Sequence, residues 1–123
     1  MNGACLFCKI VGEEIPSTPV WSSERSYAFR DLNPQAPTHV LVVPRRHITS
    51  ADTLVAEDAA DLTDLFVVAQ AVARQEGLVL GDVDPDERGG YRVAFNVGEI
   101  SGNSVPHLHL HLLGGRRLGW PPG

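Results

Sequence analysis

The sequence of 123 residues has few of the features that mark membrane, secreted or nucleic-acid-binding proteins. Its longest apolar runs fall well short of the roughly 20 residues needed to span a bilayer. The stretch 1–16 lacks the basic region and apolar run of a secretory signal peptide. Ten basic residues face fifteen acidic ones, and the formal net charge is −5, which argues against the basic face that nucleic acids and anionic membranes require. We therefore expect a cytoplasmic protein with no nucleic-acid or membrane partner, in which a local pocket for one nucleotide remains compatible with the charge.

Cysteine is also scarce. The two cysteines, Cys5 and Cys8, form one C-x-x-C motif. In a reducing compartment this spacing indicates metal ligands or a redox pair before it indicates a structural disulfide. Repeats and domain linkers are lacking, and 43% hydrophobic with 20% charged residues is typical of a globular protein. One domain covering residues 1–123 is the prediction.

Apolar spacing and turn residues predict an α+β protein. Short apolar segments predict strands at 18–23, 26–32, 39–44, 91–97 and 105–113, and a short helix at 5–12. Residues 80–90 are rich in turn residues and predict a loop. A longer helix is predicted for 56–77, with a stop at Gly77 and with an apolar stripe of Leu62, Leu65, Phe66, Ala69, Val72 and Ala73. Strands on both sides of one long helix favour a mainly antiparallel sheet covered by that helix.

The densest chemical feature is a row of histidines near the C-terminus. Three of the five histidines, His107, His109 and His111, alternate with leucines. Because strand side chains alternate between faces, the leucines are expected to pack against the helix, and the histidines to form a polar opposite face. This face has three interpretations: a solvated surface, a metal site or a catalytic row.

Strand geometry separates the last two interpretations. Alternate Cα atoms lie about 6.6 Å apart, so the outer two histidines are about 13 Å apart. A zinc–nitrogen bond is about 2 Å long, so one ion cannot collect all three imidazoles. The spacing instead favours a catalytic row that spans a phosphate. In such a row one neutral imidazole attacks the phosphate, while the neighbouring imidazoles hold or orient the attacking ring.

The string from His107 to Leu113 resembles the motif His-φ-His-φ-His-φ-φ, with φ apolar, of the histidine triad (HIT) nucleotide hydrolases and transferases. Segments 7–17, 28–48 and 91–116 resemble successive blocks of that family, and the ending GWPPG resembles its Hint branch, the nucleoside phosphoramidases. The resemblance implies the HIT-like fold: a five-stranded, mainly antiparallel sheet with one long helix and a short N-terminal helix. It also implies a homodimer with a continuous ten-stranded sheet.

The resemblance assigns catalytic roles to five residues. It implies that His109 attacks the α-phosphorus of a purine nucleoside phosphate ester or amide, and that water hydrolyses the resulting nucleotidyl-histidine. His111 would donate to a nonbridging phosphate oxygen, and the carbonyl of His107 would accept from His109. Ser104 would donate to the phosphate or to the leaving group. His39 matches a family histidine packed behind the triad, for which a catalytic and a purely structural role stay open.

The same resemblance assigns the nucleotide pocket. Asp31 would bind the ribose hydroxyls, and Gly102 would allow close approach of backbone to the phosphate. The full set of implied nucleotide contacts is Asp31, Leu32, Phe7, Leu6, Ile10, Phe29, Asn96, Gly102, Ser104 and His111. Turn chemistry remains the alternative for Ser104 and Asn96, and core packing for Phe29. The chemistry requires no metal cofactor.

A structural zinc site is implied for the C-x-x-C motif. In many bacterial HIT proteins, residues matching Cys5, Cys8, His47 and His107 bind zinc, and a Cys2His2 set suits tetrahedral zinc. The alternative is two reduced thiols with His47 at the surface. Pro106 stands where the family has an aromatic residue, and it removes one backbone donor before the triad.

The leading functional hypothesis is a purine nucleoside phosphoramidase that takes a purine nucleoside monophosphate or its phosphoramidate. Its rivals are a dinucleoside polyphosphate hydrolase of the same family, a non-catalytic nucleotide-binding regulator, and a zinc-binding module without turnover. The hexose-1-phosphate uridylyltransferases have glutamine at the third triad position, so His111 argues against that branch.

Overall fold

The computed structural model describes residues 5–80 and 89–123. The predicted loop at 80–90 lies almost wholly outside these residues. The described elements, in chain order, are α1 (Leu6–Val11), β1 (Pro19–Ser22), β2 (Ser26–Arg30), β3 (Thr38–Pro44), the 3-10 turns η1 (Ala51–Thr53) and η2 (Ala56–Asp58), α2 (Ala59–Gln75), β4 (Tyr91–Ala94), the 3-10 turn η3 (Glu99–Ser101) and β5 (Leu110–Gly114). Among them is no helix long and apolar enough to cross a membrane.

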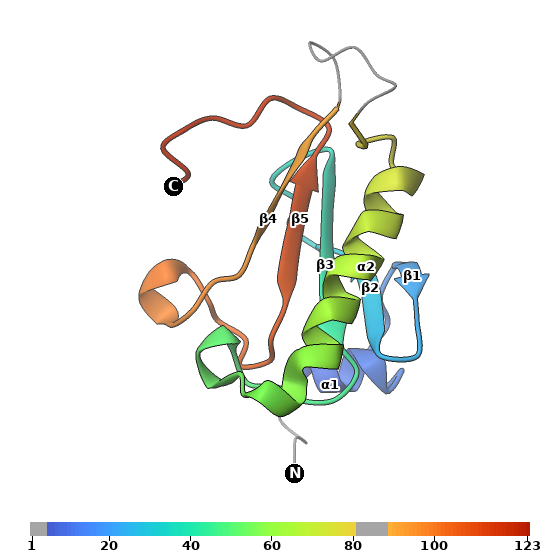
Figure 1. The fold of residues 1–123 in the computed structure, drawn as a ribbon, viewed down its shortest axis with the longest axis vertical. Coiled ribbons are helices and arrows are strands. Elements are labelled where there is room, and N and C mark those ends of the chain that lie inside the picture. Colours follow the sequence, from blue (N-terminus) through green and yellow to red (C-terminus); the bar gives the residue numbers. More distant parts are fainter. Residues whose placement is uncertain (1–4, 81–88) are drawn as a thin grey trace.

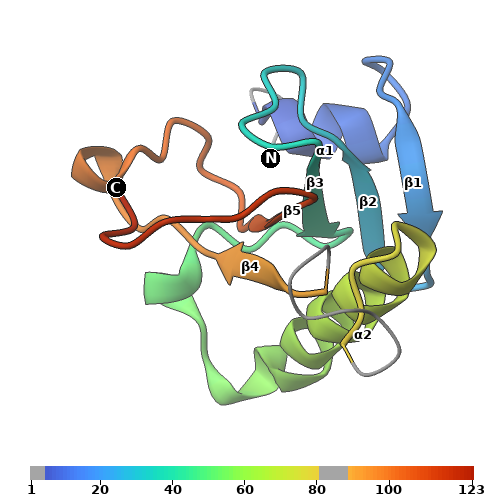
Figure 2. The ribbon, with the colours of Figure 1, turned by 90° about the horizontal axis from the view of Figure 1, so that it is seen from above.

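The five strands form one sheet in the order β1-β2-β3-β5-β4, and every neighbouring pair is antiparallel. The helix α2 crosses one face of this sheet, and α1 lies on the opposite face (Figures 1 and 2). The predicted α+β fold, with one long helix and a short N-terminal helix, is thus confirmed. The order also leaves β1 and β4 as the edge strands, with β3 at the centre.

The central strand β3 is buried along its whole length because both of its faces are covered. On the α2 side, Val40 and Val42 join a core cluster that includes Leu65 and Val72 of the helix. On the α1 side, Leu41 and Val43 pack with α1 in a second cluster. His39 lies on this second face, since alternate strand residues share a face.

The long helix begins and ends close to its predicted bounds. Gly77 has φ +74, a left-handed conformation that favours glycine and ends the helix. The predicted stripe was wrong in one respect, because Phe66 is 39% exposed whereas Val68 is buried. The buried face is centred on Leu65, Val68 and Val72, so it is rotated slightly from the predicted one.

The last two strands are shorter than predicted. β4 ends at Ala94 rather than at residue 97, and β5 begins at Leu110 rather than at residue 105. Pro106 carries no N–H to donate to a neighbouring strand. The N–H of His107 bonds to the carbonyl of Val105 within a turn, and that of Leu108 bonds to the carbonyl of Ile48. The first two histidines of the row therefore precede β5 instead of lying within it.

The alternation of the row nevertheless persists through this segment. Leu108, Leu110 and Leu112 all join the core cluster under α2, as predicted. The histidine side of the row is not a solvated surface, because His107 is fully buried and His109 is 8% exposed. The physical reason is α1, whose Phe7 packs edge-on against both imidazole rings.

Candidate functional site

A pocket of about 450 Å³ opens on the α1 side of the sheet, a volume within the usual range for small-molecule sites. Eleven residues predicted for the site line it: Leu6, Phe7, Ile10, Phe29, Asp31, Leu32, His39, Gly102, Ser104, His109 and His111. The sequence reasoning missed the other lining residues: Ile15, Pro16, Ser17, Arg30, Asn33, Gln35, Leu41 and Val105. The pocket therefore combines an apolar part that includes side chains of α1 with the histidines His39, His109 and His111.

One predicted nucleotide contact lies outside this lining. Asn96 is half-buried, and its amide nitrogen lies 4.0 Å from the position that a Cβ on Gly102 would take. Gly102 itself has φ +100 and ends η3 in a left-handed turn, which explains why glycine occupies this position. Asn96 thus lies behind the turn that brings Gly102 and Ser104 to the pocket.

His109 has a defined orientation. Its Nδ1 lies 2.7 Å from the carbonyl oxygen of His107, and because a carbonyl only accepts, the imidazole proton is on Nδ1. Burial lowers the pKa of His109, although this hydrogen bond opposes the shift. The ring is therefore neutral near pH 7, with the lone pair of Nε2 available in the pocket. This is the state that a nucleophilic imidazole requires.

His39 and His111 are joined in a second hydrogen-bonded chain. The backbone N–H of Gln35 donates to Nδ1 of His39 (3.0 Å). Burial lowers the pKa of His39 despite the nearby charge of Asp31, so the neutral ring carries its proton on Nε2. That Nε2–H lies 3.0 Å from Nδ1 of His111.

The hydrogen bonds from Gln35 to His39 and from His39 to His111 determine which nitrogen of His111 can donate. Burial, followed by the proximity of His109 and His39, lowers the pKa of His111 to about 4. A neutral His111 that accepts at Nδ1 keeps its proton on Nε2. His111 also lines the pocket. The pocket therefore has both a hydrogen-bond donor, Nε2–H of His111, and a lone pair, on Nε2 of His109.

Asp31, His39 and His111 also hold three donor atoms close enough together for a metal ion. The hydrogen bond from Gln35 argues against such a site. A neutral His39 can ligate through Nε2 only if its proton moves to Nδ1, where the Gln35 N–H already points. The group is better described as a hydrogen-bonded chain than as a metal centre.

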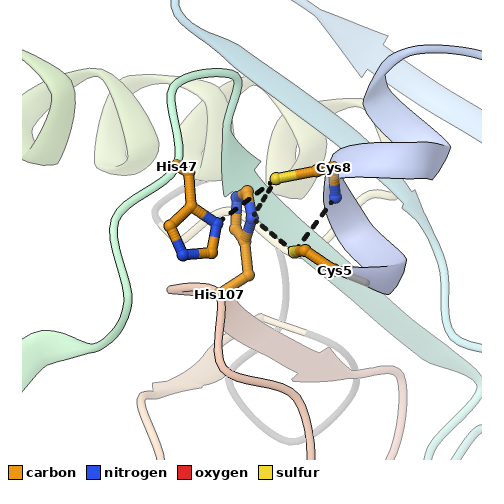
Figure 3. Close-up of side chains that lie close together, drawn as sticks. All are labelled: Cys5, Cys8, His47 and His107. Atoms are coloured by element: carbon orange, nitrogen blue, oxygen red, sulfur yellow. Dashed lines mark hydrogen bonds between the residues drawn. The ribbon is translucent and has the colours of Figure 1, made fainter. Parts of the chain in front are cut away.

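The second cluster of donors comprises Cys5, Cys8, His47 and His107 (Figure 3). Nδ1 of His107 lies 3.2 Å from Sγ of Cys5 and 3.4 Å from Sγ of Cys8. Sγ of Cys8 lies 3.2 Å from Nδ1 of His47. The structure thus brings together all four residues of the expected Cys2His2 set, from α1, the segment after β3 and the segment before β5.

The donor chemistry of this cluster fits zinc. Tetrahedral zinc with bonds of about 2.3 Å to sulfur and 2.05 Å to nitrogen separates these atoms by about 3.5 Å, close to the observed distances. Nε2–H of His107 donates to the carbonyl of Pro44 (3.0 Å), which leaves Nδ1 unprotonated and directed at the thiols. Without an ion, burial and the adjacent Cys5 raise the pKa of Cys8 to about 11, so its sulfur is a neutral thiol.

Comparison with known proteins identifies the family of this chain. The HIT domain model matches residues 12–118. An uncharacterized HIT-like protein of Synechococcus elongatus is 43% identical over 123 residues, which cover both chains completely. A 14 kDa zinc-binding protein of Zea mays is 46% identical over 120 residues, covering 96% of this chain and 87% of the maize protein. A HIT family hydrolase from Legionella pneumophila superposes with a TM-score of 0.86 at 44% identity, covering 97% of this chain and 99% of that one.

These matches extend over nearly all of the chain and include the histidine row and the sheet that carries it. They bear out the family resemblance detected in the motif from His107 to Leu113. On these grounds the chain belongs to the HIT domain family.

Proposed function

We propose that this protein is a nucleotide hydrolase that cleaves purine nucleoside 5′-phosphoramidates through a nucleotidyl-histidine intermediate on His109. The observation that carries this proposal is the hydrogen bond from Nδ1–H of His109 to the carbonyl of His107 (2.7 Å). It leaves a neutral imidazole whose Nε2 lone pair is available in the pocket. The name of the Legionella relative, a HIT family hydrolase, supports a hydrolytic role.

The proposed reaction has two displacements. In the first, Nε2 of His109 forms a bond to the α-phosphorus while the P–N bond of the substrate breaks. The leaving amine must take a proton, for which Ser104 at the pocket rim is the candidate donor. In the second, water attacks phosphorus and returns a proton to the oxygen of Ser104, the Nε2–P bond breaks, and the nucleoside monophosphate is released. Nε2–H of His111 donates to a nonbridging oxygen in both steps.

The two ends of the pocket suit the two parts of a nucleotide. The carboxylate of Asp31 can accept from ribose hydroxyls. The apolar end, with Leu6, Phe7, Ile10 and Phe29 on its walls, can take the base through nonpolar contacts. An apolar pocket makes few contacts with the polar groups of the base, so we expect the protein to accept either adenine or guanine.

Structural zinc is part of the proposal. Cys5, Cys8, His47 and His107 would hold the ion, and the zinc-binding maize relative supports this assignment. The ion would supply a cross-link between α1 and the triad segment. The reaction itself would use no metal, since His109 and His111 provide the nucleophile and the donor.

A homodimer completes the proposal. β4 is an edge strand, and apolar side chains are exposed on it and near it: Tyr91 is 37% exposed, Val93 37% and Ile100 fully. An exposed edge with apolar side chains is an expected pairing surface. Light scattering of the purified protein checks the dimer, and a monomeric mass at micromolar concentration contradicts it.

The central test uses an adenosine phosphoramidate with a fluorescent amine as leaving group. We expect wild type to release the amine, with or without a chelator in the assay, and His109→Ala to lose turnover while it still binds nucleoside monophosphate. Asp52→Asn, at an exposed position of η1, is the control and keeps wild-type rates. Nucleotide binding without any turnover by wild type contradicts the proposal and favours a binding regulator.

A further inference from the structure

We propose that Asp31 has a second task besides ribose binding: its carboxylate positions His39 and thereby the Nε2–H donor of His111. This inference rests on the proposed function, because it assigns a rate effect to the same reaction. It makes Asp31 a positioning residue for the histidines that act on the phosphate, in addition to its expected contact with the ribose.

The position of the carboxylate carries the inference. Oδ2 of Asp31 lies 3.3 Å from Nε2 of His39. Oδ1 accepts the backbone N–H of Asn33 at 2.8 Å, and the N–H of Asp31 itself donates to the carbonyl of His39 at 3.0 Å. One carboxylate oxygen and the backbone of Asp31 are thus both held, so the direction of Oδ2 toward His39 follows from the fold.

The Nε2–H of His39 therefore has one hydrogen-bond acceptor and one charged oxygen close beside it. The acceptor is Nδ1 of His111 at 3.0 Å, and the charged Oδ2 of Asp31 lies 3.3 Å from the same nitrogen. A carboxylate beside the shared proton holds the imidazole in one orientation and one tautomer. Because His39 passes this constraint to Nδ1 of His111, the donor at the far side of His111 is kept directed at the pocket.

Burial strengthens the effect of the charge. The side chain of His39 is 5% exposed and that of Asp31 is 21% exposed, so water screens their interaction poorly. The charge of Asp31 also opposes the fall in the pKa of His111 caused by burial. When His111 donates to a phosphate that gains negative charge, positive charge grows on the imidazoles of His111 and His39. The carboxylate of Asp31 stabilises this positive charge.

The experiment separates ribose binding from positioning by removing the ribose hydroxyls from the substrate. Wild type, Asp31→Asn and the control Asp52→Asn are assayed on the adenosine phosphoramidate and on its 2′,3′-dideoxy analogue. If Asp31 positions His39, the Asn variant lowers kcat about tenfold on the dideoxy substrate as well, the size expected from losing a charge contact that water screens poorly. Equal kcat for wild type and Asp31→Asn on the dideoxy analogue overturns the inference, since Asp31 then acts only through ribose.

A measurement without turnover keeps the inference testable if the proposed function fails. In ¹H–¹⁵N spectra of wild type, we expect one Nε2-protonated tautomer for both His39 and His111, with a downfield Nε2–H resonance for His39. Asp31→Ala should move that resonance upfield, whereas Asp52→Asn leaves it in place. An unchanged His39 resonance in Asp31→Ala refutes the positioning role, whatever the enzyme assay shows.

Discussion

The ring of Phe7 lies edge-on to the ring of His109, with their centroids 4.9 Å apart and an angle of 80° between their planes. Phe7 belongs to α1, which contains Cys8 and is capped by Cys5, and both cysteines are part of the Cys2His2 cluster. One short helix therefore contacts the candidate nucleophile, lines the base end of the pocket and carries two metal donors. We therefore expect the cluster and the pocket to be coupled through this helix.

Replacing Cys8 by serine tests the coupling. The variant loses one of four zinc donors, so we expect the zinc content of the purified protein and its melting temperature to fall. Because α1 is then less firmly held and Phe7 no longer forms a fixed wall, KM should rise about tenfold, which corresponds to about 1.4 kcal/mol of binding. kcat should change less, because His109 keeps its bond to the His107 carbonyl.

The control for this variant is Lys9→Ala, which changes the same helix but removes no donor. It should keep the zinc content and KM of wild type. A Cys8→Ser protein with full zinc content, or with lost zinc and unchanged KM, contradicts the coupling. Treating wild type with a strong chelator should reproduce the Cys8→Ser effect on KM.

The buried leucines of the histidine row can be tested by stability. Leu112 is fully buried in the cluster under α2, so Leu112→Ala should lower the free energy of unfolding by about 3 kcal/mol through the cavity it leaves. Leu113 is half-buried on the other face, and Leu113→Ala should cost only about 1 kcal/mol. Urea denaturation measures both variants, and equal losses would contradict the alternation.

This alternation explains how much of the fold could be predicted. The period of two in the row placed its leucines under α2 correctly, because backbone geometry alone sets which side chains share a face. It could not predict that His107 is buried, since a pattern of two faces does not say what covers the second one. The cover is α1, which joins the triad segment through long-range contacts.

In the candidate site, too, some residues could be predicted from a sequence motif, whereas the role of others depends on the fold. The histidines, Asp31 and the apolar wall could be named because their side chains form a family motif. Gln35 could not, because it acts on His39 through its backbone N–H, and any residue other than proline has one. The late start of the triad strand likewise depends on where the N–H groups of His107 and Leu108 find acceptors.

An ion pair on the α2 side of the sheet predicts a pH dependence of stability. Both guanidinium Nη atoms of Arg30 donate to the carboxylate of Glu76, at 2.8 and 3.0 Å, and Thr38 donates to it at 3.2 Å. The hydrogen bonds from Arg30 are the main reason why the pKa of Glu76 lies below its usual value of 4.5. A carboxyl with a depressed folded pKa stabilises the protein above its unfolded pKa.

Glu76→Gln should therefore be less stable than wild type at pH 7, by about 1 kcal/mol because the arginine is partly exposed to solvent. As the pH falls below about 4.5 and then through the lower folded pKa, the difference between the two proteins should shrink toward zero. Urea denaturation at pH 7, 5, 4 and 3 measures it, with Glu24→Gln in an exposed turn as control. A difference that stays constant over this range rules out the ion pair as its cause.

The C-terminal tail provides the last prediction. A guanidinium nitrogen of Arg92 donates to the carbonyl of Gly119 at 2.9 Å, and the same group lies 5.7 Å from the ring centroid of Trp120. The tail is thus held beside the edge strand β4, while Trp120 itself is 80% exposed. In the proposed dimer this places a stiff apolar segment at the partner's side of the edge.

Ending the chain after Leu118 should then change the ratio of kcat/KM values for a bulky aromatic amine and a small aliphatic amine, with little change in melting temperature. Trp120→Ala should shift the ratio in the same direction, since it removes the aromatic group alone. An unchanged ratio in both variants shows that the tail takes no part in selecting the leaving group.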